Sequence, residues 1–355
     1  MPKGRRKAAR VNQVSLAKRL GLSQFTVSEA LRGSEKVAPE TRRRVLVAAE
    51  KAGYRIHASA RATRTGRFGG IALLRGPIAD AYWFPMDLLF GIEFALDRRE
   101  QRLVMARLPP DAVADEKAIP NLLRELSVDG ALVHCNPAPP PALPDLLKRF
   151  AVPTIYLNVK GPHDCVHPDD VAGGRMATER LIDLGHRRIA FLTRAGSHYS
   201  IADRRAGYET AMRTAGLTPQ SLELPEAMGR ADIEAGTRRA EWLHGPGRPT
   251  GAVAYSLREA DLILRTALEE GLSVPRDLSV ICAAADNTNL SENVFGVTSV
   301  EIFWVAVGCT AVELLMRKIA APHQPLDSVA VAPRFREGRT IGPAAPRSDA
   351  GSASG

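Results

Sequence analysis

Residues 14–55 read VSLAKRLGLSQFTVSEALRGSEKVAPETRRRVLVAAEKAGYR, and this stretch contains three short helical patterns. Asn12 and Ser23 are favourable N-caps for the first two helices. Gly21 and Gly33 are favourable terminators, and proline is favoured in the first turn of the third helix. The predicted helices are Gln13–Leu20, Gln24–Arg32 and Pro39–Lys51. Three helices of this length and spacing predict a helix-turn-helix head.

The second predicted helix has two different faces. Spacing of i, i+3 and i+4 places Val27, Ala30 and Leu31 on one face, which we expect to pack inward. In a helix-turn-helix, the N-terminal part of the second helix enters the major groove of DNA. The opposite face is therefore predicted to read base edges, with an ordinary solvated helix face as the alternative interpretation. Its residues are Gln24, Phe25, Ser28 and Glu29.

Positive charge is concentrated at the N-terminal end of the chain. Residues 1–66 contain 16 Lys and Arg against 4 Asp and Glu, whereas the whole chain of 355 residues has a net charge of +9. The rest of the chain is therefore slightly acidic, and a basic head on a near-neutral body is typical of proteins that bind nucleic acid. Candidates for phosphate contacts, or alternatively for solvated charges, are Lys18, Arg42, Arg43 and Arg44.

Beyond residue 68, short apolar runs alternate with helical patterns. The predicted strands are Gly70–Leu74, Leu103–Ala106, Gly130–Cys135, Thr154–Leu157, Arg188–Thr193, Gly251–Tyr255 and Leu278–Ala283. The predicted helices are Asp87–Glu100, Glu116–Leu126, Leu143–Phe150, Val171–Leu184, Ala202–Ala215, Asp232–Leu243, Glu259–Glu270 and Phe303–Ala320. Such alternation predicts parallel sheets covered by helices on both faces. Two such series predict an α/β body of two Rossmann-like lobes.

Several classes of function lack support in the sequence. The four cysteines and eight histidines show no metal-ligand spacing, and no G-x-S-x-G nucleophile motif is present. No apolar run approaches 18 residues, and the basic start MPKGRRKAAR is not followed by an apolar segment. We therefore expect a cytoplasmic protein that is not an enzyme and needs no metal or cofactor. Its basic start is expected to be a phosphate-contacting arm or a disordered tail.

The head resembles that of the lactose-repressor (LacI/GalR) family of bacterial transcription regulators. The positions that carry this resemblance are Ala17, Gly21, Ser23, Thr26, Val27, Ser28, Leu31, Gly33, Val37, Pro39, Glu40, Thr41, Arg44, Val45, Gly53 and Tyr54. Residues 169–193, DDVAGGRMATERLIDLGHRRIAFLT, resemble the start of the family's second lobe. The resemblance implies a periplasmic-binding-protein-like body with a small effector, usually a sugar, between its lobes. It also implies a homodimer, or a tetramer, that represses transcription from a pseudo-palindromic double-stranded DNA operator.

This resemblance predicts five regions in the chain. They are a basic arm with the helix-turn-helix (1–55), a hinge (56–67), a first lobe (68–158 with 288–321), a second lobe (159–287 with 322–341) and a disordered tail (342–355). In the family, the chain crosses between the lobes three times. The crossovers are expected near Asn158–Gly161, Asp286–Glu292 and Ala320–Gln324.

The head and hinge depart from the family pattern at positions that would touch DNA. Glu29 stands where many members place an arginine that contacts the operator, which implies a different operator base or an indirect role. Thr63 stands where members place the leucine that wedges into the minor groove, so an apolar wedge is lost. Arg61 and Arg64 remain candidates for reading a narrow minor groove.

Effector-binding candidates follow the predicted strands, because ligands of α/β lobes lie beyond the carboxyl ends of strands. They are Tyr82, Trp83, Phe84, Asn158, Asp169, Arg204, Ser256, Asp286 and Trp304. The aromatic residues would stack on a sugar or form a packed patch. Arg204 matches the family's effector-binding arginine, with a structural salt bridge as the alternative. Other polar positions of the family are lost, so an effector-independent regulator and a solute-binding protein remain alternatives.

Overall fold

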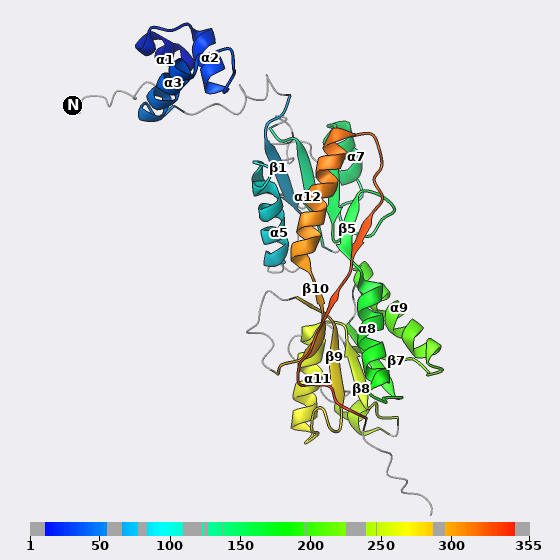
Figure 1. The fold of residues 1–355 in the computed structure, drawn as a ribbon. Helices are drawn as coiled ribbons and strands as arrows, with labels where there is room; N and C mark the ends of the chain where they lie inside the picture. The colour runs from blue at the N-terminus through cyan, green and yellow to red at the C-terminus, as the bar shows by residue number, and fades with distance from the viewer. Residues whose placement is uncertain are drawn as a thin grey trace, which may run out of the picture. The chain divides into compact units, whose positions relative to one another are not determined.

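The computed structural model describes residues 11–54, 66–76, 84–108, 123, 127–136, 138–194, 196, 198–224, 239–245, 247–286 and 295–344. The chain divides into two compact units, Met1–Phe68 and Gly69–Gly355, which we call the head and the body. The head has a small hydrophobic core, and the body has larger cores around two sheets. Figure 1 shows the helices of the head and the two sheet-based lobes of the body.

The head consists of α1 (Gln13–Leu20), α2 (Gln24–Leu31) and α3 (Pro39–Lys51), which confirms the predicted helices. Asn12 and Ser23 cap α1 and α2, because their side chains accept hydrogen bonds from backbone N–H groups of the first turn. A glycine with a left-handed backbone follows each helix. The core that these helices share consists of Leu16, Ala17, Val27, Ala30, Val37, Val45 and Ala49.

The first lobe contains a parallel sheet with the strand order β11-β5-β4-β3-β1-β2. Its strands are β1 (Gly70–Arg75), β2 (Arg102–Arg107), β3 (Gly130–His134), β4 (Thr154–Leu157), β5 (Cys165–Pro168) and β11 (Val329–Val331). Its helices are α5 (Met86–Asp97), α7 (Leu143–Arg149) and α12 (Trp304–Ala320). Apart from Leu123, the predicted helix 116–126 lies outside the described residues.

The second lobe repeats this architecture with the strand order β12-β10-β9-β8-β6-β7, in which β12 alone is antiparallel to its neighbour. Its strands are β6 (Ile189–Arg194), β7 (Gln220–Leu224), β8 (Gly251–Ala254), β9 (Ser279–Asp286), β10 (Thr298–Ile302) and β12 (Arg334–Arg336). Its helices are α8 (Asp170–Asp183), α9 (Tyr199–Thr214) and α11 (Leu257–Glu269). Of the predicted helix 232–243, the structure describes residues from 239 onward. Two parallel-sheet lobes are therefore confirmed.

The chain crosses between the lobes later than predicted at all three places. The first crossover follows β5 rather than Asn158–Gly161, because β5 pairs with β4. The second follows β10 rather than Asp286–Glu292, because β10 pairs with β9. The third lies between β11 and β12 rather than at Ala320–Gln324. The predicted lobe boundaries after residues 158, 287 and 321 are therefore wrong, each by one short strand and its loop.

In each lobe, one pair of helices packs at glycines, which lets the two backbones approach closely. A Cβ atom added to Gly174 of α8 would overlap the carbonyl oxygen of Arg204 on α9. One added to Gly207 of α9 would overlap the carbonyl oxygen of Val171. Gly91 allows the same close approach between α5 and α12 in the first lobe. The glycines of α8 and α9 hold the side chains at the start of α8 beside the arginine of α9.

The start of the predicted tail is ordered. The N–H group of Ala344 donates a hydrogen bond to the carbonyl oxygen of Leu184, with an N···O distance of 2.9 Å. The imidazole of His186 hydrogen-bonds with the carbonyl oxygen of Gly342 at 3.0 Å. The prediction of disorder from residue 342 is therefore wrong for residues 342–344, and residues 345–355 lie outside the described residues.

Candidate nucleic-acid interface and interlobe site

The outward face of α2 is fixed by the residues that pack inward. Val27 and Ala30 are fully buried in the core of the head. Gln24 and Phe25 are exposed, and 69% of the surface of Phe25 is accessible. Ser28 is half-buried. A short helix with a capped N-terminus thus presents an amide, an aromatic ring and a hydroxyl, which is the chemistry that reads base edges.

Glu29 lies apart from this face, which corrects the expectation that it reads base edges directly. It is 9% exposed, and its carboxylate accepts a hydrogen bond from Nη1 of Arg32. A side-chain hydrogen bond from Ser34, together with the Arg32 guanidinium, holds the pKa of Glu29 below its ordinary value. Because the carboxylate is engaged within the head, Glu29 is not the free acceptor that direct base reading requires.

The candidate phosphate contacts divide into two groups. Lys18 and Arg44 are exposed. Arg42 is half-buried, and its Nη2 donates to the carbonyl oxygen of Ser34 at 2.6 Å, so it braces the segment between α2 and α3. Arg43 is exposed and forms an ion pair with Glu40. The hinge candidates Arg61, Thr63 and Arg64 lie outside the described residues.

The two lobes of the body contact each other through the end of β4 and the start of α9. Asn158, which has a positive φ of 54°, follows β4 directly. Its side-chain oxygen accepts a hydrogen bond from the Tyr199 hydroxyl at 3.0 Å, and its side-chain nitrogen lies 3.3 Å from Nε2 of His198. Lys160 adds an ion pair with Asp203 of α9 at 2.6 Å. Asn158 is therefore an interlobe contact residue in this structure.

Arg204 is buried in an ion pair with Asp170, the first residue of α8. Its Nε lies 2.7 Å from Oδ1 of Asp170, and its Nη1 donates to the carbonyl oxygen of Tyr255 at 2.8 Å. The guanidinium also lies over the Tyr255 ring, with its Cζ atom 4.3 Å from the ring centroid. Burial alone would lower the pKa of Arg204, but the Asp170 carboxylate outweighs it and raises the pKa. In this structure Arg204 therefore forms a structural salt bridge, which was the alternative to an effector-binding role.

The other effector candidates do not form one cluster. Trp304 is 1% exposed in the core of the first lobe, so its ring cannot offer a stacking face, which corrects the expected role. Phe84 lies edge-on to His134 at 5.1 Å. Asp169 caps α8, and Ser256 caps α11 and donates to Glu259. Tyr82, Trp83 and the side chain of Asp286 lie outside what the structure describes.

Sequence reasoning missed three polar residues near the interlobe contact: Asp170, His198 and Tyr199. The adjacent aspartates 169 and 170 are a signal that the sequence does contain. Asp169 caps α8, which leaves Asp170 to form an ion pair with another residue. Buried His134 lies near the same contact. Burial lowers its pKa to about 4, assisted by repulsion from His198 and Arg75. His134 is therefore neutral near pH 7.

The described residues show neither a membrane-spanning helix nor a metal-binding cluster. No helix there is both long and apolar enough to cross a membrane. No cluster of three or more His, Cys, Asp or Glu side chains with metal-binding geometry occurs in the same parts of the chain.

Comparisons with known proteins match the whole architecture. Residues 15–56 match the family described as bacterial regulatory proteins, lacI family, and residues 178–341 match the periplasmic binding protein-like domain. The HTH-type transcriptional repressor PurR of Escherichia coli is 28% identical over 335 residues, which cover 92% of this chain and 95% of that protein. The structure is similar to a lac repressor dimer bound to operator and the anti-inducer ONPF, with a TM-score of 0.76, 21% identity, and coverage of 94% and 99% of the two chains. It is also similar to a complex of the transcriptional regulator CelR with cellobiose, with a TM-score of 0.60, 24% identity, and coverage of 93% and 100%.

The buried ion pair generates a prediction about stability. Asp170→Asn should lower the free energy of unfolding by about 3 kcal/mol, because Arg204 would keep its charge in a buried site without a counter-ion. Asp261→Asn, in an exposed i,i+4 pair with Arg265, should cost less than about 0.5 kcal/mol. Urea unfolding of both variants tests this, and equal losses would contradict the assigned role of Asp170.

Proposed function

Because this chain belongs to the lacI family of bacterial regulatory proteins, we propose that it is a sequence-specific DNA-binding regulator of transcription, and a repressor. The observation that carries the proposal is the outward face of α2. The helix is capped by Ser23 and packed through Val27 and Ala30, so that Gln24, Phe25 and Ser28 are left for the major groove. Lys18 and Arg44 would contact phosphates, in the cytoplasm where the operator lies.

Removal of residues 1–66 should abolish specific binding to duplex DNA, because it removes α2 together with the segment that makes the chain net positive. The measurement is fluorescence anisotropy with duplexes that the full-length protein enriches from a randomised pool. The truncated body should keep the circular dichroism of a folded α/β protein, since it is a compact unit with its own cores. Specific binding by the truncated protein would refute the assignment of the head.

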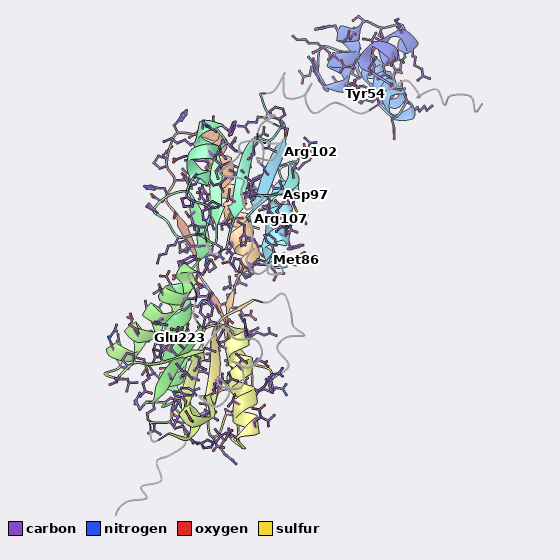
Figure 2. All side chains as sticks on the ribbon, turned by 180° about the vertical axis from the view of Figure 1, so that it is seen from behind. Tyr54, Met86, Asp97, Arg102, Arg107 and Glu223 are labelled. Carbon is purple, nitrogen blue, oxygen red and sulfur yellow. The ribbon has the colours of Figure 1, made fainter. Side chains whose placement is uncertain are left out.

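We propose further that two copies pair through the flank formed by α5 and β2. Figure 2 shows this flank of the first lobe, with Met86 and Asp97 at the ends of α5 and Arg102 and Arg107 at the ends of β2. Its exposed apolar side chains are Met86, Phe90, Phe94 and Met105. The strand β2 is the last in its sheet, and an apolar flank with a strand edge is typical of a protein interface. A second copy is the expected occupant, since the similar lac repressor is a dimer on its operator.

The double substitution Phe90→Lys with Phe94→Lys should convert the dimer to monomers at micromolar concentration. The two rings stack on each other with centroids 6.3 Å apart, and replacing them with charges would cost more than about 2 kcal/mol at an interface. Sedimentation velocity gives the masses. Leu268→Lys, which changes an exposed apolar residue of α11, is the control and should stay dimeric. Dimers in both variants would place the interface elsewhere.

We propose that a small effector, sugar-like in its hydroxyl groups, binds near the interlobe contact beside Asn158 and Arg204. Asn158 joins the end of β4 to α9, so a ligand that competes for its amide would alter the contact between the lobes. Asp169 and Ser256 lie at the starts of α8 and α11. The similar regulator CelR is named as a complex with cellobiose. The ion pair between Asp170 and Arg204 favours the effector-independent alternative, because Asp170 already neutralises the arginine.

A thermal-shift screen of sugars, polyols and nucleosides separates these two alternatives. A ligand at 100 times its dissociation constant should stabilise the body by about 2.7 kcal/mol through mass action. Asn158→Ala should abolish the shift, whereas Asn12→Ala, which changes a cap of the head, should retain it. A regulator without an effector would show no shift with any compound.

A further inference from the structure

The exposed stripe of α2 extends one turn beyond the residues that the helix-turn-helix pattern identifies. Gln24, Ser28 and Arg32 are spaced four residues apart and lie in one row along the helix. Val27 and Ala30 lie on the opposite, buried side. Arg32, the C-cap residue, is therefore aligned with two candidates for base reading. At 1.5 Å per residue it lies about 12 Å along the axis from Gln24, which corresponds to three or four base-pair steps.

The Arg32 guanidinium is held in place by Glu29. Its Nη1 donates to Oε1 of Glu29, and the two side chains are 35% and 11% exposed. The carboxylate is held in turn by a side-chain hydrogen bond from Ser34, in the turn that follows α2. The N–H group of Ser34 donates to the carbonyl oxygen of Glu29 at 3.1 Å, and that of Gly33 to Ala30 at 3.1 Å, which locks the turn. The arginine thus has a rigid support rather than a flexible partner.

One edge of the guanidinium remains open. Glu29 uses Nη1, and among the described residues neither Nε nor Nη2 of Arg32 has a hydrogen-bond partner. These two N–H groups point in parallel from one planar edge, and two parallel donors match the O6 and N7 acceptors of guanine in the major groove. A guanidinium that is already oriented loses less side-chain entropy when it binds.

We propose that Arg32 reads a guanine in the operator and that Glu29 is its positioning residue. This inference rests on the proposed function, because it requires α2 to lie in the major groove. It also accounts for the acidic residue at position 29. Glu29 contacts no base itself, and it orients an arginine three residues further along the chain. A phosphate contact would need only the charge of Arg32, whereas bidentate guanine recognition by an arginine uses its planar pair of donors.

Selection from a randomised duplex pool, followed by affinity measurements, tests the proposal with full-length protein. The variants are Arg32→Ala, Arg32→Lys and Glu29→Gln. Arg19→Ala is the matched control, since it removes one positive charge from an exposed position of the head outside α2. Circular dichroism and thermal unfolding establish that each variant is folded.

The wild type should enrich a site with a guanine at one position in each half. Arg32→Ala and Arg32→Lys should both lose that preference, with binding to the guanine site weakened on the order of 10- to 100-fold. Glu29→Gln should weaken the preference partly, because a neutral amide orients the guanidinium less firmly. Arg19→Ala should keep the wild-type sequence preference.

Two results would overturn the inference while leaving the proposed function intact. If Arg32→Lys keeps the full guanine preference, the planar pair of donors is not what reads the guanine. If Arg32→Ala selects the wild-type site unchanged, the ion pair is only a surface feature. A wild-type protein that enriches no sequence would instead remove the proposed function and this inference together.

Discussion

The packing of three short helices around Val27 and Ala30 is the constraint on which the account of the head depends. A helix of eight residues is not stable alone in water, so α2 exists because α1 and α3 cover its apolar side. That packing leaves no rotational freedom. With Val27 and Ala30 inward, the row Gln24, Ser28 and Arg32 must point outward. The chemistry offered to DNA is thus set by the core of the head.

The head could be predicted almost completely from its sequence, because its helices begin and end at local signals. Asn12, Ser23 and the glycines that follow the helices act within a few residues, and the structure contains all of them in those roles. The roles of Glu29 and Arg42 were predicted less well, because helical periodicity shows on which face of a helix a side chain lies but not which residue it contacts. Their partners lie three and eight residues away, in a turn whose backbone the pattern does not specify.

The body could be predicted as a fold but not in its connections. The crossovers follow β5, β10 and β11, which have three to five residues and are too short or too polar to show a strand pattern. Arg204 could be identified by resemblance, yet its partner Asp170 is 34 residues away on another helix. The contact depends on Gly174 and Gly207, whose missing side chains bring α8 and α9 together. Such close packing of two helices depends on the tertiary structure, so local sequence patterns do not reveal it.

The head and the body therefore use charge differently. In the body, the cation of Arg204 is neutralised inside the protein, whereas in the head Arg32 is held at the surface with one edge open. The most direct measurement of the central claim is a structure of the full-length protein bound to an enriched operator duplex. We expect α2 to lie in the major groove, with Gln24 and Ser28 against base edges. A complex in which α2 faces solvent while another surface holds the duplex would contradict this expectation.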